Sequence, residues 1–297
     1  MKIGIVGAGK WGQALQYAFS KNLDNEVYIT SRTQKNIPHF VSVDEILELE
    51  YLVFAISAQN ARGWLEENFV FKNQKILVAS KGIEVRSGKF LNALFEEYVP
   101  EENTAYISGP SFAAEVIQGL PCALVINSTN NKLAEKYASF FPSFIKAYTS
   151  KDVIGAEVSG AYKNVIAIAS GICEGLGLGN NARASLISRG LVEMMRFGKH
   201  FGAKKNSFLG LGGAGDLFLT ASSKLSRNYR VGLALAEGKS LDVILRELGE
   251  VAEGVPTAEA IVKIAKREGI YAPIATEVHA ILEGKNPKES LKDLLSN

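Results

Sequence analysis

The chain has 297 residues, 47% hydrophobic and 22% charged, the composition of a globular protein with material for two domains. Its formal net charge of +2 gives no general reason to expect nucleic acid or an anionic membrane as a partner. Apolar runs of membrane-spanning length are absent, and two distant cysteines, Cys122 and Cys173, argue against a disulfide framework or a zinc site. We therefore expect a cytoplasmic protein with no metal and no integral membrane segment.

Seven short runs rich in β-branched and apolar residues fill the first half of the chain, separated by stretches with helical periodicity. Strand and helix taking turns in this way indicates crossover units and a mostly parallel, doubly wound sheet with both faces covered, an α/β fold. The strands are expected at residues 2–6, 26–30, 51–56, 75–80, 104–108, 122–127 and 144–149.

Beyond about Lys151 the strand signal disappears, and helical periodicity broken by Gly and Pro takes over. Pro273 suits the first turn of a helix, and Gly238 and Gly269 suit helix ends. The pattern predicts a first domain over residues 1–149 and an all-α second domain over residues 150–297. Its helices are expected at 152–173, 182–201, 228–237, 241–248, 257–268 and 273–283.

The stretch GAGKWG follows the first predicted strand directly and opens a helix. Its glycines, Gly7, Gly9 and Gly12, permit a tight turn, close approach of a pyrophosphate and close helix packing, while free N–H groups receive the negative charge. The loop, which includes Lys10 and Trp11, thus predicts a dinucleotide-binding Rossmann domain. A tight βα turn without a ligand is the alternative.

The end of the second strand carries Ser31 and Arg32 where an acidic residue would bind the ribose hydroxyls of NAD. An arginine at this point can pair with a 2′-phosphate or stack on adenine. We therefore expect NADP(H) to be accepted alongside NAD(H). A solvated loop arginine is the alternative.

A helix predicted around residues 157–171 has one charged residue, Lys163, between Glu157 and Glu174. A helix with so few charges is buried nearly all round, and a buried ammonium is expensive unless it is paired. This favours a functional lysine. The alternative is a lysine whose stem lies along apolar surface and whose head reaches water.

Seven motifs follow one another after the glycine-rich loop: KGIE (81–84), GPSFAAEV (109–116), AYKNVIAIASG (161–171), GLGLGNNARASLISRGLVEM (175–194), GLGGAGDL (210–217), SRN (226–228) and VAEGVPTAEA (251–260). In this order they resemble bacterial NAD(P)-dependent sn-glycerol-3-phosphate dehydrogenase, from Gly7 to beyond Pro273. The resemblance implies a helical domain of the 6-phosphogluconate-dehydrogenase-like type, with the active site between the domains. It also implies an oxidoreductase that makes glycerol phosphate for phospholipid synthesis.

The resemblance also implies a catalytic centre in the second domain. Lys163 matches the general base that exchanges a proton with the C2 oxygen of the substrate, and Asn164 matches a substrate-orienting amide. Asp216 and Thr220 match the residues that complete this polar centre, with Asp216 also touching substrate. For Asp216 a simple helix cap is the alternative.

Substrate and cofactor contacts are implied in the same way. Lys81 matches a positive group for both, and Gly109 and Ser111 match substrate contacts. The SRN triplet, Ser226, Arg227 and Asn228, matches a phosphate site in which the arginine also meets the cofactor, with a surface turn as the alternative. The remaining implied cofactor contacts are Ala113, Val251 and Glu253.

The match has departures. The family commonly has leucines at the positions of Val158 and Tyr162, and its loop after the second strand is variable. Two other functions stay open from the residues: a β-hydroxyacid or phosphogluconate-type dehydrogenase, and a non-catalytic NADPH sensor. The sequence does not determine the oligomeric state. A homodimer is one possibility.

Overall fold

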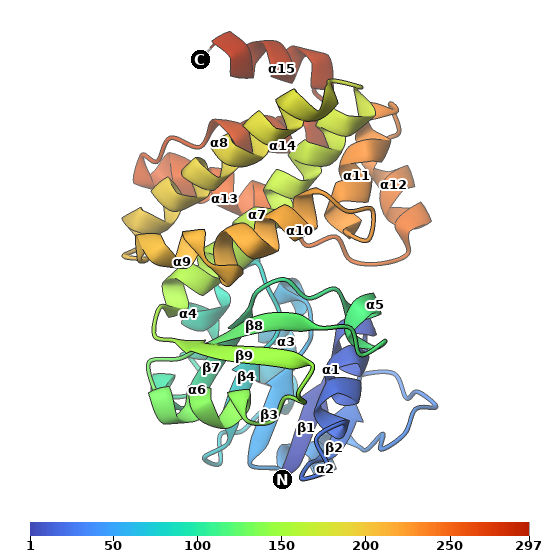
Figure 1. Ribbon diagram of the computed structural model, residues 1–297, viewed down its shortest axis with the longest axis vertical. Helices are drawn as coiled ribbons and strands as arrows, with labels where there is room; N and C mark the ends of the chain where they lie inside the picture. Colours follow the sequence, from blue (N-terminus) through green and yellow to red (C-terminus); the bar gives the residue numbers. More distant parts are fainter. Residues whose placement is uncertain (297) are drawn as a thin grey trace. The chain divides into compact units, whose positions relative to one another are not determined.

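The computed structural model describes residues 1–296 and divides into two compact units. Unit 1 comprises Met1–Ser80 and Leu91–Ala156, and unit 2 comprises Lys81–Phe90 and the chain from Glu157 onward. Figure 1 shows the sheet of unit 1 and the helices of unit 2. Over the described residues, no helix combines the length and the apolar character that crossing a membrane requires.

Unit 1 is built on one seven-stranded sheet with the order β2-β1-β3-β4-β7-β8-β9. Neighbouring strands are parallel except β7 and β8, which confirms the predicted mostly parallel sheet. The third and fourth strands end two residues earlier than expected, because residues 55–56 and 79–80 leave the ladder to form loops. The strands are β1 (Lys2–Val6), β2 (Glu26–Thr30), β3 (Tyr51–Phe54), β4 (Lys75–Val78), β7 (Thr104–Ser108), β8 (Cys122–Asn127) and β9 (Ile145–Ser150).

Each face of this sheet has its own apolar core. On one face Ile3 and Ile5 pack with Leu15 of α1 (Lys10–Ser20) and with α6 (Asn131–Ala138). On the other face Val6 joins a cluster with α2, α3 and α4, as expected for a doubly wound sheet. The remaining helices of unit 1 are α2 (Val43–Leu47), α3 (Ala58–Asn68), α4 (Leu91–Phe95), α5 (Ala113–Val116) and a 3₁₀ turn at Glu101–Asn103.

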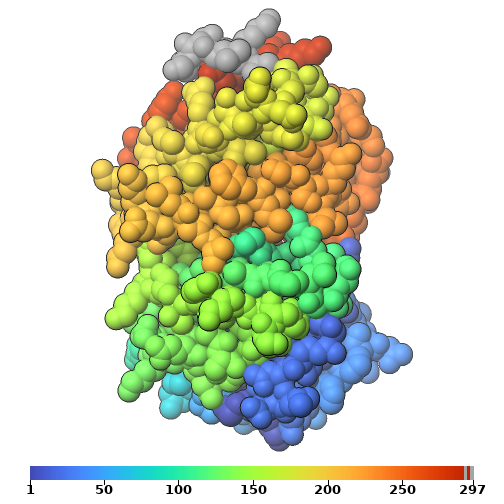
Figure 2. Space-filling model, in the orientation of Figure 1, coloured from blue at the N-terminus to red at the C-terminus, as the bar shows by residue number. Residues whose placement is uncertain are grey.

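From Glu157 to residue 296 unit 2 is helical, as predicted, and GLGLGN connects its first two helices. Sequence periodicity missed a short hairpin, β5 (Ile83–Glu84) with β6 (Lys89–Phe90), and several short helical segments. In Figure 2 the yellow and orange surface of residues in α8 to α12 covers this face of the unit. The helices are α7 (Val153–Gly175), α8 (Gly179–His200), α9 (Lys205–Leu209), a π turn (Leu211–Gly215), α10 (Asp216–Ala221), α11 (Arg227–Ala236), α12 (Leu241–Leu248), α13 (Gly254–Glu268), α14 (Pro273–Leu282) and α15 (Pro287–Ser296).

Helix α7 is the core of unit 2, and every residue from 155 to 173 is buried. Glycines let α11 approach it backbone to backbone. A Cβ at Gly171 would lie 2.1 Å from the Tyr229 carbonyl oxygen, and one at Gly232 would lie 2.0 Å from the Ile168 carbonyl oxygen. Both contacts are too short for any side chain, so this crossing requires glycine on both helices.

A buried carboxylate joins three helices of unit 2. The Glu193 carboxylate of α8 accepts hydrogen bonds from the Ile274 and Ala275 amides at 2.8 and 2.9 Å, at the start of α14. It also accepts one from the Tyr162 hydroxyl at 2.8 Å, so the tyrosine that departs from the family pattern has a polar partner. Burial raises the pKa of Glu193, while the two amides oppose that rise.

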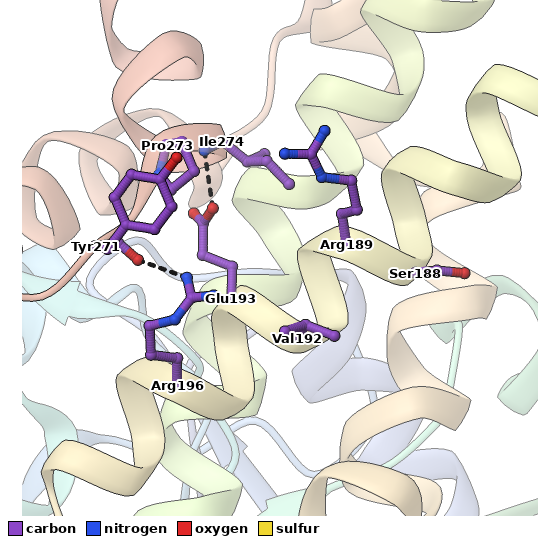
Figure 3. A pocket seen from close by; sticks show the side chains of 8 residues that line it. All are labelled: Ser188, Arg189, Val192, Glu193, Arg196, Tyr271, Pro273 and Ile274. Atoms are coloured by element: carbon purple, nitrogen blue, oxygen red, sulfur yellow. Dashed lines mark hydrogen bonds between the residues drawn. The ribbon is translucent and has the colours of Figure 1, made fainter. Parts of the chain in front are cut away.

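Figure 3 shows this carboxylate at the side of a cavity of about 240 Å³ between α8 and the start of α14. Arg196, which also lines the cavity, is turned to the carbonyl oxygen of Tyr271 at 2.8 Å. Arg189 lies on the same stretch of α8. Two charged residues of this cavity, Glu193 and Arg196, bind backbone groups. We therefore interpret the arrangement as part of the packing between α8 and the start of α14.

The α7–α11 crossing predicts a large effect for Gly171→Ala. The added methyl group would meet backbone atoms that cannot move independently, so we expect a loss of about 3 kcal/mol in the free energy of unfolding. Urea unfolding followed by circular dichroism measures it. Gly63→Ala is the matched control, because Gly63 lies in α3 with open space around it, and there alanine should stabilise by about 0.5–1 kcal/mol. Equal urea midpoints for Gly171→Ala and Gly63→Ala would contradict the close approach of α7 and α11.

Candidate active site

The Lys163 ammonium lies in a polar cluster inside unit 2. Its Nζ donates to the Asp216 carboxylate and to Thr220 Oγ1, the latter at 3.1 Å. Asp216 and Thr220 are four residues apart on α10 and therefore share a face of that helix. Lys163 is 7% exposed and Asp216 1%, so the alternative of a lysine head that reaches water is wrong. Asp216 makes no cap either, since α10 has no side-chain cap bond.

A second ammonium approaches the same carboxylate. Lys81 Nζ donates to Asp216 Oδ2 at 2.7 Å, while Lys163 binds Oδ1. A Cβ added at Gly160 would lie 3.2 Å from Cγ of Lys81, so the lysine stem lies directly against α7 at a residue without a side chain. Asp216 is thus held between two lysines, one on α7 and one before the β5–β6 hairpin.

Burial is the largest influence on Lys163 and lowers its pKa; the Asp216 carboxylate opposes this, and the Lys81 ammonium adds to it. The outcome is a pKa lowered from 10.5 to about 7. For Asp216, burial alone would raise the pKa, but the two ammonium groups hold it below the ordinary value. Near neutral pH the carboxylate is therefore ionised, and the Lys163 amine gains or loses its proton readily.

The start of α13 contacts both Asn164, the residue after Lys163 on α7, and Asn228 of the SRN triplet. The Gly254 amide donates to Asn228 Oδ1 at 2.9 Å, and a Cβ at Gly254 would lie 2.7 Å from the Asn164 carbonyl oxygen. Asn164 itself donates its side-chain amide to the Gly160 carbonyl at 3.2 Å. Glycine at 254 thus lets α7, α11 and α13 meet, and brings Asn164 and Asn228 close together.

The SRN triplet forms the start of α11. Ser226 is the N-cap, and its hydroxyl accepts the Tyr229 amide at 3.2 Å. Arg227 is the first residue of the helix, with a side chain 43% exposed and 3.6 Å from Glu250. A ten-residue helix that begins with an arginine offers both N–H groups and a guanidinium to an anion. Val251 is exposed and Glu253 is half-buried, both just before α13.

In unit 1 the glycine-rich loop has the geometry that its spacing predicts. Gly7 has φ of +112°, and a Cβ at Gly12 would lie 1.8 Å from the Gly7 carbonyl oxygen, so both positions require glycine. Gly9 has nothing within 4 Å of where its Cβ would be. Open space therefore lies above the loop at the start of α1, whose first residues are the exposed Lys10 and the partly buried Trp11.

Other predicted residues of unit 1 lie at the same edge of the sheet. Strands β1, β3, β4 and β7 run parallel, so their carboxyl ends coincide, and Trp11 Nε1 donates to the Ala79 carbonyl at 3.0 Å across that edge. Gly109 follows β7 with φ of +109°, and Ser111 Oγ donates to its carbonyl at 3.2 Å. Ala113 begins α5.

The loop after β2 holds a second cation, Lys35, which the sequence patterns did not indicate as a site residue. Arg32 is exposed there, and Lys35 Nζ donates to the Ala8 carbonyl of the glycine-rich loop at 2.6 Å. A sequence feature that could have pointed to Lys35 is the absence of any Asp or Glu between Glu26 and Asp44. Glu193 was missed as well, because its partners lie 31 and 81 residues away. Within the described residues no three His, Cys, Asp or Glu side chains form a metal-binding group.

Family models match both parts of the chain. Residues 34–134 match the model described as NAD-dependent glycerol-3-phosphate dehydrogenase N-terminus, and residues 152–292 match the corresponding C-terminus model. The two matches cover more than half of the sequence.

Whole-chain relatives agree with the family models. A protein of Sulfurimonas denitrificans named glycerol-3-phosphate dehydrogenase, NAD(P)+, is 64% identical, with 100% of this chain and 99% of the relative covered. A Nitratiruptor protein of the same name is 61% identical over 99% of this chain and 98% of the relative. The crystal structure of glycerol-3-phosphate dehydrogenase from Coxiella burnetii matches with a TM-score of 0.90 at 29% identity, covering 100% of this chain and 99% of that one. The chain belongs to the NAD-dependent glycerol-3-phosphate dehydrogenase family.

Proposed function

We infer that this chain is an oxidoreductase that interconverts sn-glycerol 3-phosphate and dihydroxyacetone phosphate with NAD(H) or NADP(H). The observation that carries the mechanism is the buried Lys163 amine, held against Asp216 with a pKa of about 7. The reaction supplies glycerol phosphate for phospholipid synthesis. Family membership favours this over the hydroxyacid dehydrogenase and the non-catalytic sensor.

We assign dinucleotide binding to residues 1–149, and substrate binding with catalysis to residues 150–297. The glycine-rich loop supports the first assignment, because its glycines leave the backbone open where a pyrophosphate would meet the N–H groups of α1. The carboxyl edge of the sheet, between β1 and β3, is where the strand order reverses. The proposed cofactor contacts are Gly7, Gly9, Lys10, Trp11, Gly12, Arg32, Lys81, Ala113, Arg227, Val251 and Glu253.

The proposed role of Lys163 is general base and general acid. The dinucleotide, when bound, supplies or receives the hydride at C2 of the substrate. Neutral Lys163 accepts the C2 hydroxyl proton of glycerol 3-phosphate, and its ammonium form returns a proton to the C2 oxygen of dihydroxyacetone phosphate. Asp216 and Thr220 fix the position of Nζ, and Asn164 orients the substrate.

Substrate phosphate is proposed to bind at the start of α11. Arg227 supplies a guanidinium and the helix supplies N–H groups, while the Ser226 cap and the Asn228–Gly254 bond hold that turn in place. The ion pair with Glu250 would exchange for the phosphate. Lys81, Gly109 and Ser111 are the other proposed substrate contacts.

We also propose a cytoplasmic location. Both cysteines of the chain, Cys122 and Cys173, are free, which suits a reducing compartment. A homodimer is the simplest closed assembly for such an enzyme, and light scattering after size exclusion distinguishes it from a monomer.

Lys163→Ala should lower kcat for dihydroxyacetone phosphate reduction by about 10²- to 10⁴-fold, because the proton donor is lost. Dinucleotide oxidation at 340 nm measures it, and calorimetric titration should show that dinucleotide binding persists. Lys199→Ala, at the exposed end of α8, is the control and should keep parent activity. Equal kcat values for Lys163→Ala and the parent would remove this residue from the mechanism.

The pKa of Lys163 predicts opposite pH profiles for the two directions. Oxidation of glycerol 3-phosphate needs the neutral amine, so kcat should rise with pH through about 7, whereas reduction needs the ammonium and should decline there. In Asp216→Asn the carboxylate that raises the pKa is gone, so the inflection should move to lower pH. An inflection that stays in place would assign the titration to another group, such as the substrate phosphate.

Arg227→Ala should raise KM for dihydroxyacetone phosphate by about tenfold or more, since a charge-assisted contact to the phosphate is lost, with a smaller change in KM for the dinucleotide. Steady-state kinetics with each substrate varied in turn separates the two constants. Arg230→Ala, an exposed arginine one turn further along α11, is the matched control. An unchanged KM for dihydroxyacetone phosphate rules out the phosphate role.

A further inference from the structure

Helix α10 carries Asp216 and Thr220 but is only six residues long, from Asp216 to Ala221. The end groups of a helix have no partner inside it, so a helix this short is held in place mainly by its neighbours. Its first turn is bound to α7 through the Lys163 ammonium, which donates to Asp216 and Thr220. Whatever fixes the other end of α10 therefore also affects where the Asp216 carboxylate lies.

Ser170 of α7 binds that other end. Its hydroxyl donates to the Ala221 carbonyl oxygen at 2.6 Å, and Ser170 is fully buried. Ala221 is the last residue of α10, so its carbonyl is one that the helix itself does not pair. A serine inside a helix commonly donates to the carbonyl four residues earlier on its own helix. A hydroxyl has one proton to donate, and Ser170 donates it to a different helix.

Lys163 and Ser170 lie on one face of α7. They are seven residues apart, close to two full turns, which places them about 10 Å apart along the helix axis. Helix α7 thus holds α10 at two points, with an ammonium at its first turn and a hydroxyl at its end. Two contacts resist rotation and tilting of a short helix better than one contact does. The place of the Asp216 carboxylate between Lys163 and Lys81 therefore depends on Ser170.

We propose that Ser170 is a positioning residue that keeps the Asp216 carboxylate against the Lys163 ammonium and so sets the pH at which Lys163 exchanges its proton. This rests on the role of Lys163 proposed above. The charged groups that act on Lys163 Nζ are Asp216 of α10 and Lys81 before the β5–β6 hairpin. If α10 tilts, the attraction of Asp216 weakens, while burial and the Lys81 charge still favour the neutral amine. The inflection of the pH profile then moves to lower pH.

The pH dependence of kcat in the full-length enzyme tests this proposal. For Ser170→Ala we expect kcat of dihydroxyacetone phosphate reduction just above neutral pH to fall by about 3- to 10-fold, with KM for the dinucleotide within about twofold. The inflection should move to lower pH. Tyr162→Phe is the matched control, because it removes another buried hydroxyl of α7, one that binds Glu193 and not α10. It should lose stability but keep the inflection of the parent.

A double-mutant cycle separates positioning from a general loosening of unit 2. Asp216→Asn removes the carboxylate, so adding Ser170→Ala to it should not move the inflection further. Ser170→Cys keeps the size of the side chain with a weaker donor, and its inflection should lie between those of the parent and Ser170→Ala.

A parent-like inflection in Ser170→Ala would overturn the proposal, and so would an equal shift with and without the Asp216 carboxylate. Either result leaves the dehydrogenase assignment intact as long as the parent reduces dihydroxyacetone phosphate. A parent that does not turn this substrate over would overturn both.

Discussion

The polar cluster of unit 2 depends on one carboxylate between two ammonium groups. Asp216 is buried and would be expensive to ionise there alone, but Lys163 and Lys81 each bind one of its oxygens. Of the two cations, Lys163 lies deeper and has its pKa lowered to about 7, because burial outweighs the attraction of the single carboxylate that it shares. Burial alone would lower the pKa of Lys163 further, whereas a carboxylate without the competing Lys81 ammonium would raise it. Sharing one carboxylate leaves Lys163 between these extremes.

Glycines decide how closely the backbones around this cluster approach. Gly160 admits the Lys81 stem, Gly171 admits α11, and Gly254 admits the start of α13 beside the Asn164 carbonyl. Each lies where a methyl group would collide or crowd. The helices can therefore pack closely enough to bury the polar side chains. This burial lowers the pKa of Lys163.

Local patterns in the sequence were enough for the sheet, the glycine-rich loop and the burial of Lys163, because each rests on neighbours a few residues away. Partners across the fold were not predictable from spacing. Asp216 meets Lys163 from 53 residues away and Lys81 from 135, and only the family resemblance indicated that they belong together. Lys35 escaped notice for the same reason, since its bond to Ala8 closes a loop of 27 residues. The segments α9 and α10 are too short to give a clear helical period.

The π turn before α10 has a consequence for how this family member can change. Its wide, glycine-rich backbone at Leu211–Gly215 runs straight into Asp216, and a Cβ at Gly213 would lie 2.2 Å from the Phe208 carbonyl oxygen. A single insertion or deletion in this turn would change the register at which α10 begins, and so would rotate the Asp216 carboxylate away from the lysines. We therefore expect that, as the family evolves, insertions and deletions are tolerated in the surface connections of unit 2 but not in the five residues Leu211–Gly215.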